Sequence, residues 1–276
     1  MKNRNAKRIL AAGAAAVLAV GLTACGGKEN KADDKTITVA ASPTPHAEIL
    51  EAAKDLLKEK GYTLEIKEFD DYPQQNVVVD EGEFDANYFQ HQPYLDNFNE
   101  EKGSDLVSAA KIHYEPLGIY PGASEDLENI KDGAKIAVPN DATNEARALL
   151  LLEENGIITL KDDAGLNATK KDVEENPHNI EIVELDAAQI ARVVDELDFV
   201  VLNGNYALDA GFNVQTDAIA KEEADSEAAQ TYANIIAVKK ENKDSEKIKA
   251  LVEVLQSEEI SKFITDTYEG AVVPMK

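Results

Sequence analysis

The stretch Phe84-Asp-Ala-Asn-Tyr-Phe-Gln-His-Gln-Pro-Tyr-Leu-Asp-Asn-Phe98 is the part of the chain around which the rest is organised. It holds five aromatic residues and one histidine, although the whole chain is only 6% aromatic and contains no Trp. Asn and Gln side chains lie among the rings, and Pro93 is expected to end the segment. This mixture is typical of a small, mostly apolar pocket with a few polar groups. The simpler alternative is a strand and a helix whose rings only fill the core.

The spacing of apolar residues on both sides of this stretch predicts alternating strands and helices. Alternation with period two predicts strands, and an i, i+3, i+4 spacing predicts amphipathic helices. The expected strands are 36–41, 62–69, 134–139, 180–185, 199–202 and 232–239, with a long extended run at 106–120; the expected helices are 48–60, 144–155 and 187–197, and one or two within 244–268. Strands separated by helices of this length indicate an α/β fold with parallel sheets.

The length of the chain indicates two α/β units rather than one. About 240 residues follow the N-terminal segment, which is enough for two domains of modest size. One unit is expected before about Tyr120 and one after it. Ligands of open α/β sheets bind beyond the carboxyl ends of the strands. The loops after Ala41 and Pro139, together with the turn expected at Tyr72, the aromatic stretch and Asn203, are therefore expected to meet in one cleft.

The N-terminus reads as a secretory signal. Four basic residues precede an apolar run from Ile9 to Leu22 that is too short for a typical membrane-spanning helix. The run closes on Leu-Thr-Ala-Cys25, which resembles the bacterial lipobox, and Cys25 is the only cysteine in the chain. Two acyl chains on this cysteine would give stable anchoring. We expect a lipoprotein signal at 1–24 and a polar tether at 25–35; the alternative is an ordinary signal peptide with an unmodified thiol.

The charge of the chain excludes one class of partner. The net charge is −25, and it becomes −29 once the signal is removed, because the signal contains four basic residues and no acidic ones. Nucleic acid phosphates require a basic surface, so no nucleic acid partner is expected. An acidic domain is also repelled by anionic lipid, so contact with the membrane is expected through the lipid on Cys25.

The loop Pro139-Asn-Asp-Ala-Thr-Asn-Glu-Ala-Arg147 joins an expected strand to an expected helix. Thr143 or Asn144 is expected to cap this helix, whose free N–H groups favour an anion. Arg147 would then lie in the first turn, where the helix dipole disfavours a cation. One interpretation is that its guanidinium is a fork for a ligand carboxylate. The other is a surface arginine paired with one of the many acidic side chains.

Motifs for metal binding or catalysis are weak or missing in the sequence. The four histidines, His46, His91, His113 and His178, could in part bind zinc with an acidic residue, but their spacing matches no compact ligand motif. Structural or pocket-lining histidines are the preferred interpretation. There is no Gly-x-Ser-x-Gly elbow, no Gly-rich phosphate loop and no His-Glu-x-x-His motif. No catalytic residue, no cofactor and no metal site is predicted, and an enzyme is not expected.

Five motifs carry a resemblance to a known family. They are Phe84–His91, Glu115–Tyr120, Ile136–Asn144 with Arg147, Val201–Ala207 and Tyr232–Asn234. Together with the lipobox, they resemble the NlpA lipoprotein family, the methionine-binding lipoproteins of bacterial ABC importers. The resemblance implies a two-lobed, periplasmic-binding-protein-like α/β fold whose lobes are joined by two hinge crossings. We expect lobe one to comprise 35–120 and 232–276, and lobe two to comprise 121–231.

The resemblance also implies which side chains bind the ligand. Four are expected around its thioether: Tyr72, Phe89, His91 and Tyr94. Five are expected around the amino acid head: Glu115, Asn144, Arg147, Asn203 and Asn234. Among these, Arg147 would bind the carboxylate, and Glu115 would lie near the ammonium.

The function implied by the resemblance is that of a lipid-anchored substrate-binding protein facing outside the cytoplasm at the cell membrane. It would capture L-methionine between its lobes and deliver it to an ABC permease driven by a separate ATPase. The alternatives are another amino acid, D-methionine or a short methionine-containing peptide as ligand. A metal-binding lipoprotein is a more distant alternative.

Overall fold

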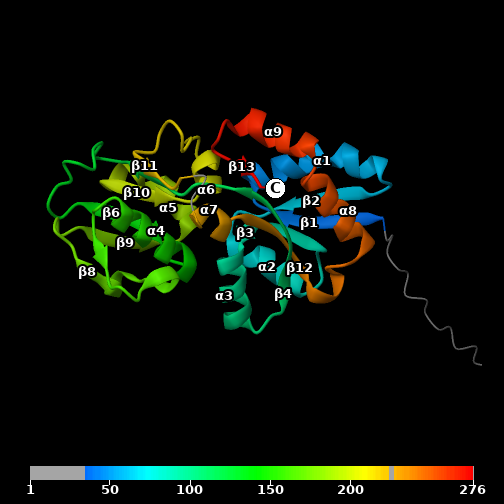
Figure 1. The fold of residues 1–276 in the computed structure, drawn as a ribbon, viewed down its shortest axis with the longest axis horizontal. Coiled ribbons are helices and arrows are strands. Elements are labelled where there is room, and N and C mark those ends of the chain that lie inside the picture. Colours follow the sequence, from blue (N-terminus) through cyan, green and yellow to red (C-terminus); the bar gives the residue numbers. More distant parts are fainter. Residues whose placement is uncertain (1–34, 224–226, 276) are drawn as a thin grey trace, which may run out of the picture. The chain divides into compact units, whose positions relative to one another are not determined.

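The computed structural model describes residues 35–223 and 227–275, which form an α/β structure built on two separate main sheets (Figure 1). The predicted α/β class is confirmed. The predicted signal, Cys25 and the tether up to residue 34 lie outside the described residues. Within the described residues, none of the helices combines the length and the apolar character needed to cross a membrane.

The first sheet has six strands and is mixed rather than parallel. Its order is β13 (Val273–Pro274), β4 (Leu106–Tyr114), β12 (Asn234–Lys239), β3 (Ala86–His91), β1 (Thr36–Ala41) and β2 (Thr63–Glu68). β1 is parallel to β2 and β3, whereas β12 is antiparallel to both β3 and β4. The expectation of purely parallel pairing was wrong here, because the chain leaves this sheet along β4 and returns to it along β12.

The second sheet has five strands and is also mixed. Its order is β11 (Ala220–Lys221), β5 (Gly118–Pro121), β10 (Phe199–Leu202), β6 (Lys135–Pro139) and β9 (Glu181–Leu185), and β7 (Thr159–Leu160) pairs separately with β8 (Val173–Glu175). β10, β6 and β9 are parallel, and β5 is antiparallel to β10.

The extended run predicted at 106–120 is divided between the two sheets. β4 ends at Tyr114 in the first sheet, and β5 begins at Gly118 in the second. Pro116 lies in the break and has no N–H with which to continue a ladder. The predicted lobe one reaches Tyr120, but β5 belongs to the second sheet. The lobe limits remain a prediction.

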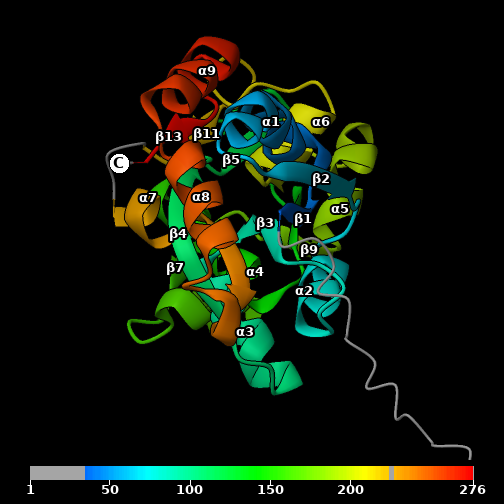
Figure 2. The same cartoon turned by 90° about the vertical axis from the view of Figure 1, so that its right-hand side faces the viewer.

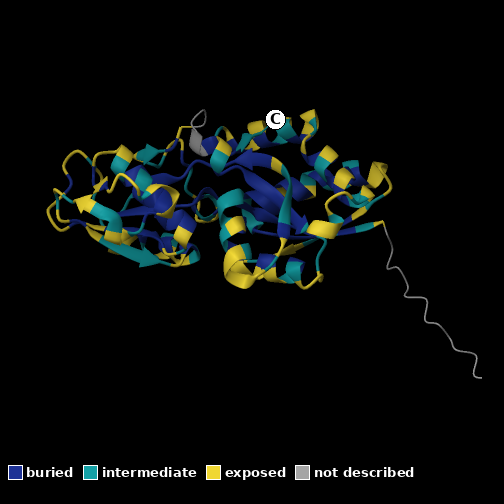
Figure 3. Ribbon diagram, turned by 60° about the horizontal axis from the view of Figure 1, so that its bottom comes forward, coloured by how far each residue is buried: buried dark blue, intermediate teal, exposed yellow. Residues whose placement is uncertain are grey.

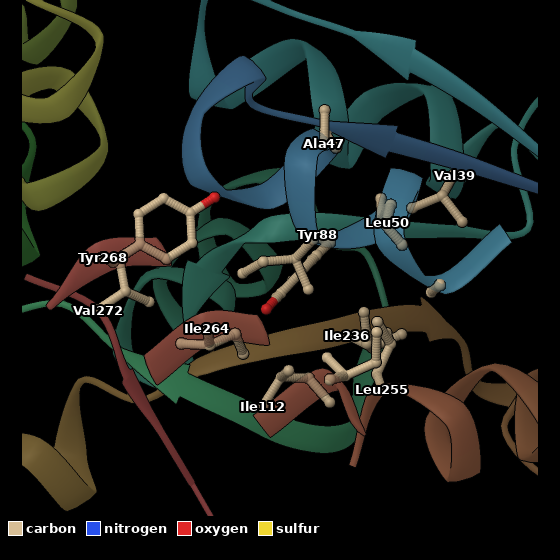
Figure 4. Packing of buried hydrophobic residues seen from close by; sticks show 14 of the residues in the cluster. Val39, Ala47, Leu50, Tyr88, Ile112, Ile236, Leu255, Ile264, Tyr268 and Val272 are labelled. Carbon is tan, nitrogen blue, oxygen red and sulfur yellow. The ribbon is translucent and has the colours of Figure 1, made fainter. Parts of the chain in front are cut away.

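Helices cover both faces of the first sheet (Figure 2). One face carries α1 (Glu48–Glu59), α8 (Glu246–Leu255) and α9 (Glu258–Tyr268), and the other carries α2 (Tyr72–Asp80) and α3 (Gln92–Lys102). Side chains of β12 alternate between them: Ile236 lies in the core cluster with α1, α8 and α9 (Figure 4), and Ile235 lies in the cluster with α2 and α3. This alternation is the period of a strand buried on both faces.

The second sheet is covered in the same manner. α4 (Ala142–Glu154) packs its leucines against β6 and β10, and on the other face lie α5 (Ala187–Ile190) and α6 (Gly204–Asp209); α7 (Glu227–Thr231) precedes the return to the first sheet. Figure 3 shows the central strands of both sheets as largely buried and the outer helix faces as exposed. The predicted helix at 187–197 is α-helical only as far as Ile190 and continues as a 3₁₀ turn.

Two helix starts near the aromatic stretch differ from expectation. Pro93 does not end an element: it lies in the first turn of α3, where a missing N–H costs nothing. His91 caps this helix, because its Nδ1 accepts the N–H of Tyr94 at 3.2 Å. Asp71 caps α2 by accepting the N–H of Gln74 at 3.0 Å, so Tyr72 lies on a helix and not in a turn.

Replacing Ile236 by Ala tests whether β12 is a central, buried strand of the first sheet. Ile236 is fully buried, so we expect Ile236→Ala to lower the free energy of unfolding by about 2–5 kcal/mol. The matched control is Ile219→Ala, because Ile219 is 37% exposed, and its loss should cost less than about 1 kcal/mol. Urea denaturation measures both values. Equal losses in the two variants would contradict the placement of β12.

Candidate ligand-binding site

One cavity contains all nine side chains that the sequence singled out as ligand-binding. Tyr72, Phe89, His91, Tyr94, Glu115, Asn144, Arg147, Asn203 and Asn234 all line it, together with Gln90, Gly204 and Asn205. Its empty volume, including the mouth, is about 330 Å³.

The first half of the structure (the six-stranded sheet with its helices) and the second half (the five-stranded sheet with its helices) both contribute to the cavity. β3, β12, α2 and α3 of the first half provide the aromatic residues, His91 and Asn234. The second half provides two residues of α4, and Asn203 at the carboxyl end of β10. Glu115 lies between β4 and β5, where the chain passes from one sheet to the other. The cavity is therefore formed where the two halves meet.

Three rings enclose the apolar end of the cavity. Tyr72 and Tyr94 lie with centroids 5.7 Å apart, and Phe89 lies 5.3 Å from Tyr72 and 5.7 Å from Tyr94. Tyr206 of α6 packs on Tyr72 from the second half at 5.0 Å. The hydroxyl of Tyr72 donates to Oδ1 of Asn205 at 2.5 Å. Faces and edges of aromatic rings thus form the apolar wall of the cavity.

The cap of α4 is Asp141, and the expectation of Thr143 or Asn144 was wrong. The helix begins at Ala142, and the carboxylate of Asp141, the residue before it, accepts the backbone N–H of Asn144 at 3.0 Å. Arg147 therefore lies in the second turn, beyond the strongest effect of the helix dipole. Burial raises the pKa of Asp141, and the hydrogen bonds from Asn144 oppose this rise.

The side chain of Asn144 forms hydrogen bonds with neighbouring residues of the cavity. Its Nδ2 donates to Asp141, and its Oδ1 accepts from Nδ2 of Asn203 at 2.8 Å and from Nε2 of His91 at 3.1 Å. Asn144 therefore orients two other lining residues. By contrast, Oδ1 of Asn203 is buried and has no hydrogen-bond partner among the described residues. That oxygen is an acceptor that a ligand donor could satisfy.

His91 is held as a neutral ring. Nδ1 accepts the N–H of Tyr94, so the proton is on Nε2, which donates to Asn144. Burial and, to a smaller extent, the nearby charge of Arg147 lower the pKa of His91 to about 3. The ring can therefore line the cavity without bringing a charge into it.

Glu115 is the centre of a buried hydrogen-bonded cluster. Nε2 of His113 donates to its Oε1 at 2.6 Å, and Nε2 of His46 lies 3.4 Å from the same oxygen while donating to Oδ1 of Asn234 at 2.9 Å. Burial raises the pKa of Glu115, and the charges of His46 and Arg147 oppose that rise. Tyr88 completes the cluster with a hydroxyl bond to Nδ1 of His113.

Gly204 is required by the close approach of α6 to Glu115. A Cβ at this position would lie 2.6 Å from Cβ of Glu115 and 2.7 Å from its Oε2. Only a residue without a side chain fits here, so Gly204 lets the start of α6 pack against the carboxylate.

The same cluster bears on the possibility of a metal site. Donor atoms of His46, His113 and Glu115 all lie within 4.8 Å of one another, and they are the group in the described part of the chain that could be considered for a metal. Their Nε2 protons, however, are already used in hydrogen bonds to Asn234 and Glu115. We therefore interpret the group as a hydrogen-bonded cluster. His178 does not line the cavity.

Arg147 is paired with an acidic side chain, as one of the two interpretations from sequence held, but it is buried; its binding of a ligand carboxylate stays a prediction. Arg147 is only 4% exposed, so it is not a surface arginine, and its fork is directed at a carboxylate of the protein itself, that of Glu222. Burial alone would lower the pKa of Arg147, but Glu222 raises it above its ordinary value. Glu222 was missed from sequence. It lies 75 residues away in a chain with 53 acidic residues, and no local signal distinguishes it.

The family of this protein can be assigned from its sequence as a whole. The sequence model of the NlpA lipoprotein family matches residues 37–276, which include every residue of the cavity. The chain belongs to the NlpA lipoprotein family. The resemblance inferred from the five motifs is thereby confirmed.

Relatives in this family cover nearly the whole chain. The methionine-binding lipoprotein MetQ of Bacillus subtilis is 44% identical over 95% of this chain and 97% of its own length. A lipoprotein structure from Ruminococcus gnavus is 67% identical, with a TM-score of 0.87, over 88% of this chain and 100% of that one. A nutrient-binding protein from Burkholderia cenocepacia, solved with methionine bound, is 43% identical with a TM-score of 0.82, over 87% of this chain and 100% of that one. The predicted two-lobed fold of the family is confirmed.

The buried histidines of this NlpA family member should make its free energy of unfolding depend on pH. Burial lowers the pKa of His46 to about 4, and of His91 and His113 to about 3, from an ordinary value of 6.5. The unfolded chain therefore binds these protons from about pH 6.5 downwards, whereas the folded chain does not. Their contribution to the free energy of unfolding falls as the pH is lowered from 6.5 towards 4.

Carbon-13 histidine NMR of the folded protein is the direct measurement. We expect the three buried rings to remain neutral at pH 5. His178, which is not fully buried, serves as an internal comparison and is assigned by His178→Gln. A buried ring that becomes protonated above pH 6 would contradict the described hydrogen bonds.

Proposed function

We propose that this protein is the lipid-anchored substrate-binding component of an ABC importer and that it binds L-methionine between its two lobes. It would then deliver the amino acid to a membrane permease driven by a separate ATPase. One observation carries the proposal: a single cavity is lined by a guanidinium, by one unsatisfied acceptor (Oδ1 of Asn203) and by three aromatic rings. This role is one of binding and transfer, without a catalysed reaction.

The polar end of the cavity suits the head of a free amino acid. Such a head is a zwitterion and needs donors for its carboxylate and acceptors for its ammonium. Arg147 supplies the donors, and Oδ1 of Asn203 and the carboxylate of Glu115 supply the acceptors. Each charge-assisted hydrogen bond contributes about 1.5–3 kcal/mol net. Three or four of them would account for most of the binding free energy, before the costs of ordering are subtracted.

The aromatic end of the cavity suits a thioether. Burial of a methionine-sized side chain is worth about 1.5–3 kcal/mol. Contacts of sulfur with rings such as Tyr72, Phe89 and Tyr94 add about 0.3–1.5 kcal/mol. This part of the affinity separates methionine from leucine only modestly. Methionine is also the ligand of the Burkholderia cenocepacia relative, and B. subtilis MetQ is named for it.

Replacing Asn203 tests the amino acid head. Because its Oδ1 has no partner in the described residues, Asn203→Ala should remove an acceptor for the ammonium, while the fold loses only the hydrogen bond that Nδ2 donates to Asn144. We expect the Kd for L-methionine, measured by calorimetry, to rise about 10- to 100-fold. The matched control is Asn129→Ala, since Asn129 is exposed and does not line the cavity.

The same titrations decide the identity of the ligand. L-methionine is expected to bind more tightly than D-methionine, L-leucine or a methionine dipeptide. Mass spectrometry of the small molecule that co-purifies gives an independent answer. No heat of binding for any of the four ligands would refute the proposed function, and tighter binding of the D-isomer or the dipeptide would replace the ligand.

The anchor is proposed to be lipid on Cys25. This residue lies outside the described part of the chain, and the support comes from the lipobox-like sequence and from a family whose members are named lipoproteins. In cells, Cys25→Ala should move the protein from the membrane fraction to the soluble, released fraction, because no acyl chain can be attached. Immunoblotting of the two fractions is the measurement. Retention of the variant in the membrane would rule out the lipid anchor.

A further inference from the structure

The guanidinium of Arg147 has a fixed orientation because of Glu222. Nε donates to Oε1 of Glu222 at 2.8 Å, and Nη2 donates to Oε2 at 2.6 Å and to the backbone carbonyl of Glu115 at 3.0 Å. A guanidinium has five N–H groups, and these bonds use three of them. The two that remain are on Nη1. A ligand carboxylate would therefore meet Nη1, whose direction is set by the pairing on the opposite edge.

Glu222 is itself held by the first chain segment that crosses between the sheets. Its Oε2 accepts the hydroxyl of Tyr114 at 2.5 Å and the N–H of Leu117 at 2.9 Å. The N–H of Glu222 donates to the carbonyl oxygen of Leu117 at 3.0 Å. Tyr114 and Leu117 flank the passage from β4 to β5, and Glu222 begins the return from β11 towards β12. Glu222 thus joins both crossings.

The second crossing also contacts Arg147. The ring of Tyr232, which precedes β12, lies 4.3 Å from the guanidinium carbon of Arg147, and the ring of Tyr114 lies 5.9 Å from it. Burial alone would raise the pKa of Glu222, but the charge of Arg147 lowers it below its ordinary value. Both partners are therefore charged, and residues from both crossings enclose them.

We propose that Glu222 is a positioning residue for the carboxylate of the ligand: it holds the Nε–Nη2 edge of Arg147 and ties the guanidinium to both crossings. The proposal rests on the function proposed above. A carboxylate on Nη1 then binds to a group whose position depends on how the two crossings are arranged. Binding of the head is in this way coupled to the relative arrangement of the two lobes.

A purely structural ion pair would have the same distances, so the test compares two ligands. Methioninol has the side chain and ammonium of methionine but no carboxylate. In Glu222→Gln we expect the Kd for L-methionine to rise at least tenfold and the Kd for methioninol to change less than threefold. A structural role would raise both values by the same factor. The affinity ratio, which is the Kd for methioninol divided by the Kd for L-methionine, should therefore fall. An unchanged affinity ratio overturns the proposal, and so does a rise in it, which would mean that Glu222 only competes with the ligand for the charge of Arg147.

Two further variants separate geometry from charge. Glu222→Asp keeps the negative charge but is one methylene shorter, so it cannot hold both nitrogens of Arg147 at the described distances. We expect the same direction of change as in Glu222→Gln; a wild-type ratio in Glu222→Asp would show that only the charge matters and would overturn positioning. The matched control is Glu223→Gln, because Glu223 is exposed and adjacent in the chain, and its ratio should equal that of the wild type.

A measurement without ligand keeps this proposal distinct from the proposed function. The Nε–H of Arg147 should give a slowly exchanging NMR signal in the wild type, and exchange should become at least tenfold faster in Glu222→Asp. Equal protection in both proteins overturns the proposal even if methionine is not the ligand. If Glu222 variants do not fold, Tyr114→Phe removes one hydrogen bond to Oε2 and leaves the ion pair in place. Its methionine-to-methioninol ratio should fall by a few fold, and an unchanged ratio counts against positioning.

Discussion

A charge buried between two sheets requires a partner, and this requirement governs the centre of the molecule. Arg147 is paired with Glu222, and Glu115 accepts from His113. Arg147 and Glu222 are 75 residues apart, and Glu222 joins residues on both sides of the passage between sheets. Removal of Glu222 would leave the charge of Arg147 uncompensated, and removal of His113 would take a hydrogen bond from the buried Glu115, so these pairs fix the positions of the groups around the cavity more narrowly than apolar packing would.

The aromatic stretch combines the two roles that its sequence allowed. Every residue of β3 is buried. Tyr88 points into the core beneath α1 and α9, where Figure 4 shows it among Leu50 and Ile264. Phe89 and His91 line the cavity instead. A strand presents alternate side chains to opposite faces, so one short segment can fill a core and form a pocket wall together. The two alternatives from sequence were not exclusive.

A structural feature could be predicted from the sequence when the residues that determine it are close together in the chain. Helices such as α1 and strands such as β1 were predicted to within a residue or two because their periodicity is local. The mixed pairing of β12 was not predicted, since it depends on a return from a distant part of the chain. The side chains that line the cavity were inferred from family motifs and not from periodicity. Glu222 had neither kind of signal, because an acidic residue in a chain of net charge −25 has many equivalent neighbours.

The division of charge between surface and interior fits a ligand without net charge. A field from many acidic groups steers ions, but a zwitterion has no net charge to be steered. The net charge of −25 therefore cannot be the source of affinity for a free amino acid, and its physical effects are solubility and repulsion from anionic lipid. Selection must come from buried groups that act at hydrogen-bond distance. Because Glu222 already offsets much of the charge of Arg147, the cavity offers a carboxylate a directed donor rather than a strong general field. With the roles proposed for Arg147 and Asn203, a ligand gains most when its carboxylate reaches Nη1 of Arg147 and its ammonium reaches Oδ1 of Asn203 at the same time. An isolated carboxylate or an isolated amine cannot meet this geometric condition.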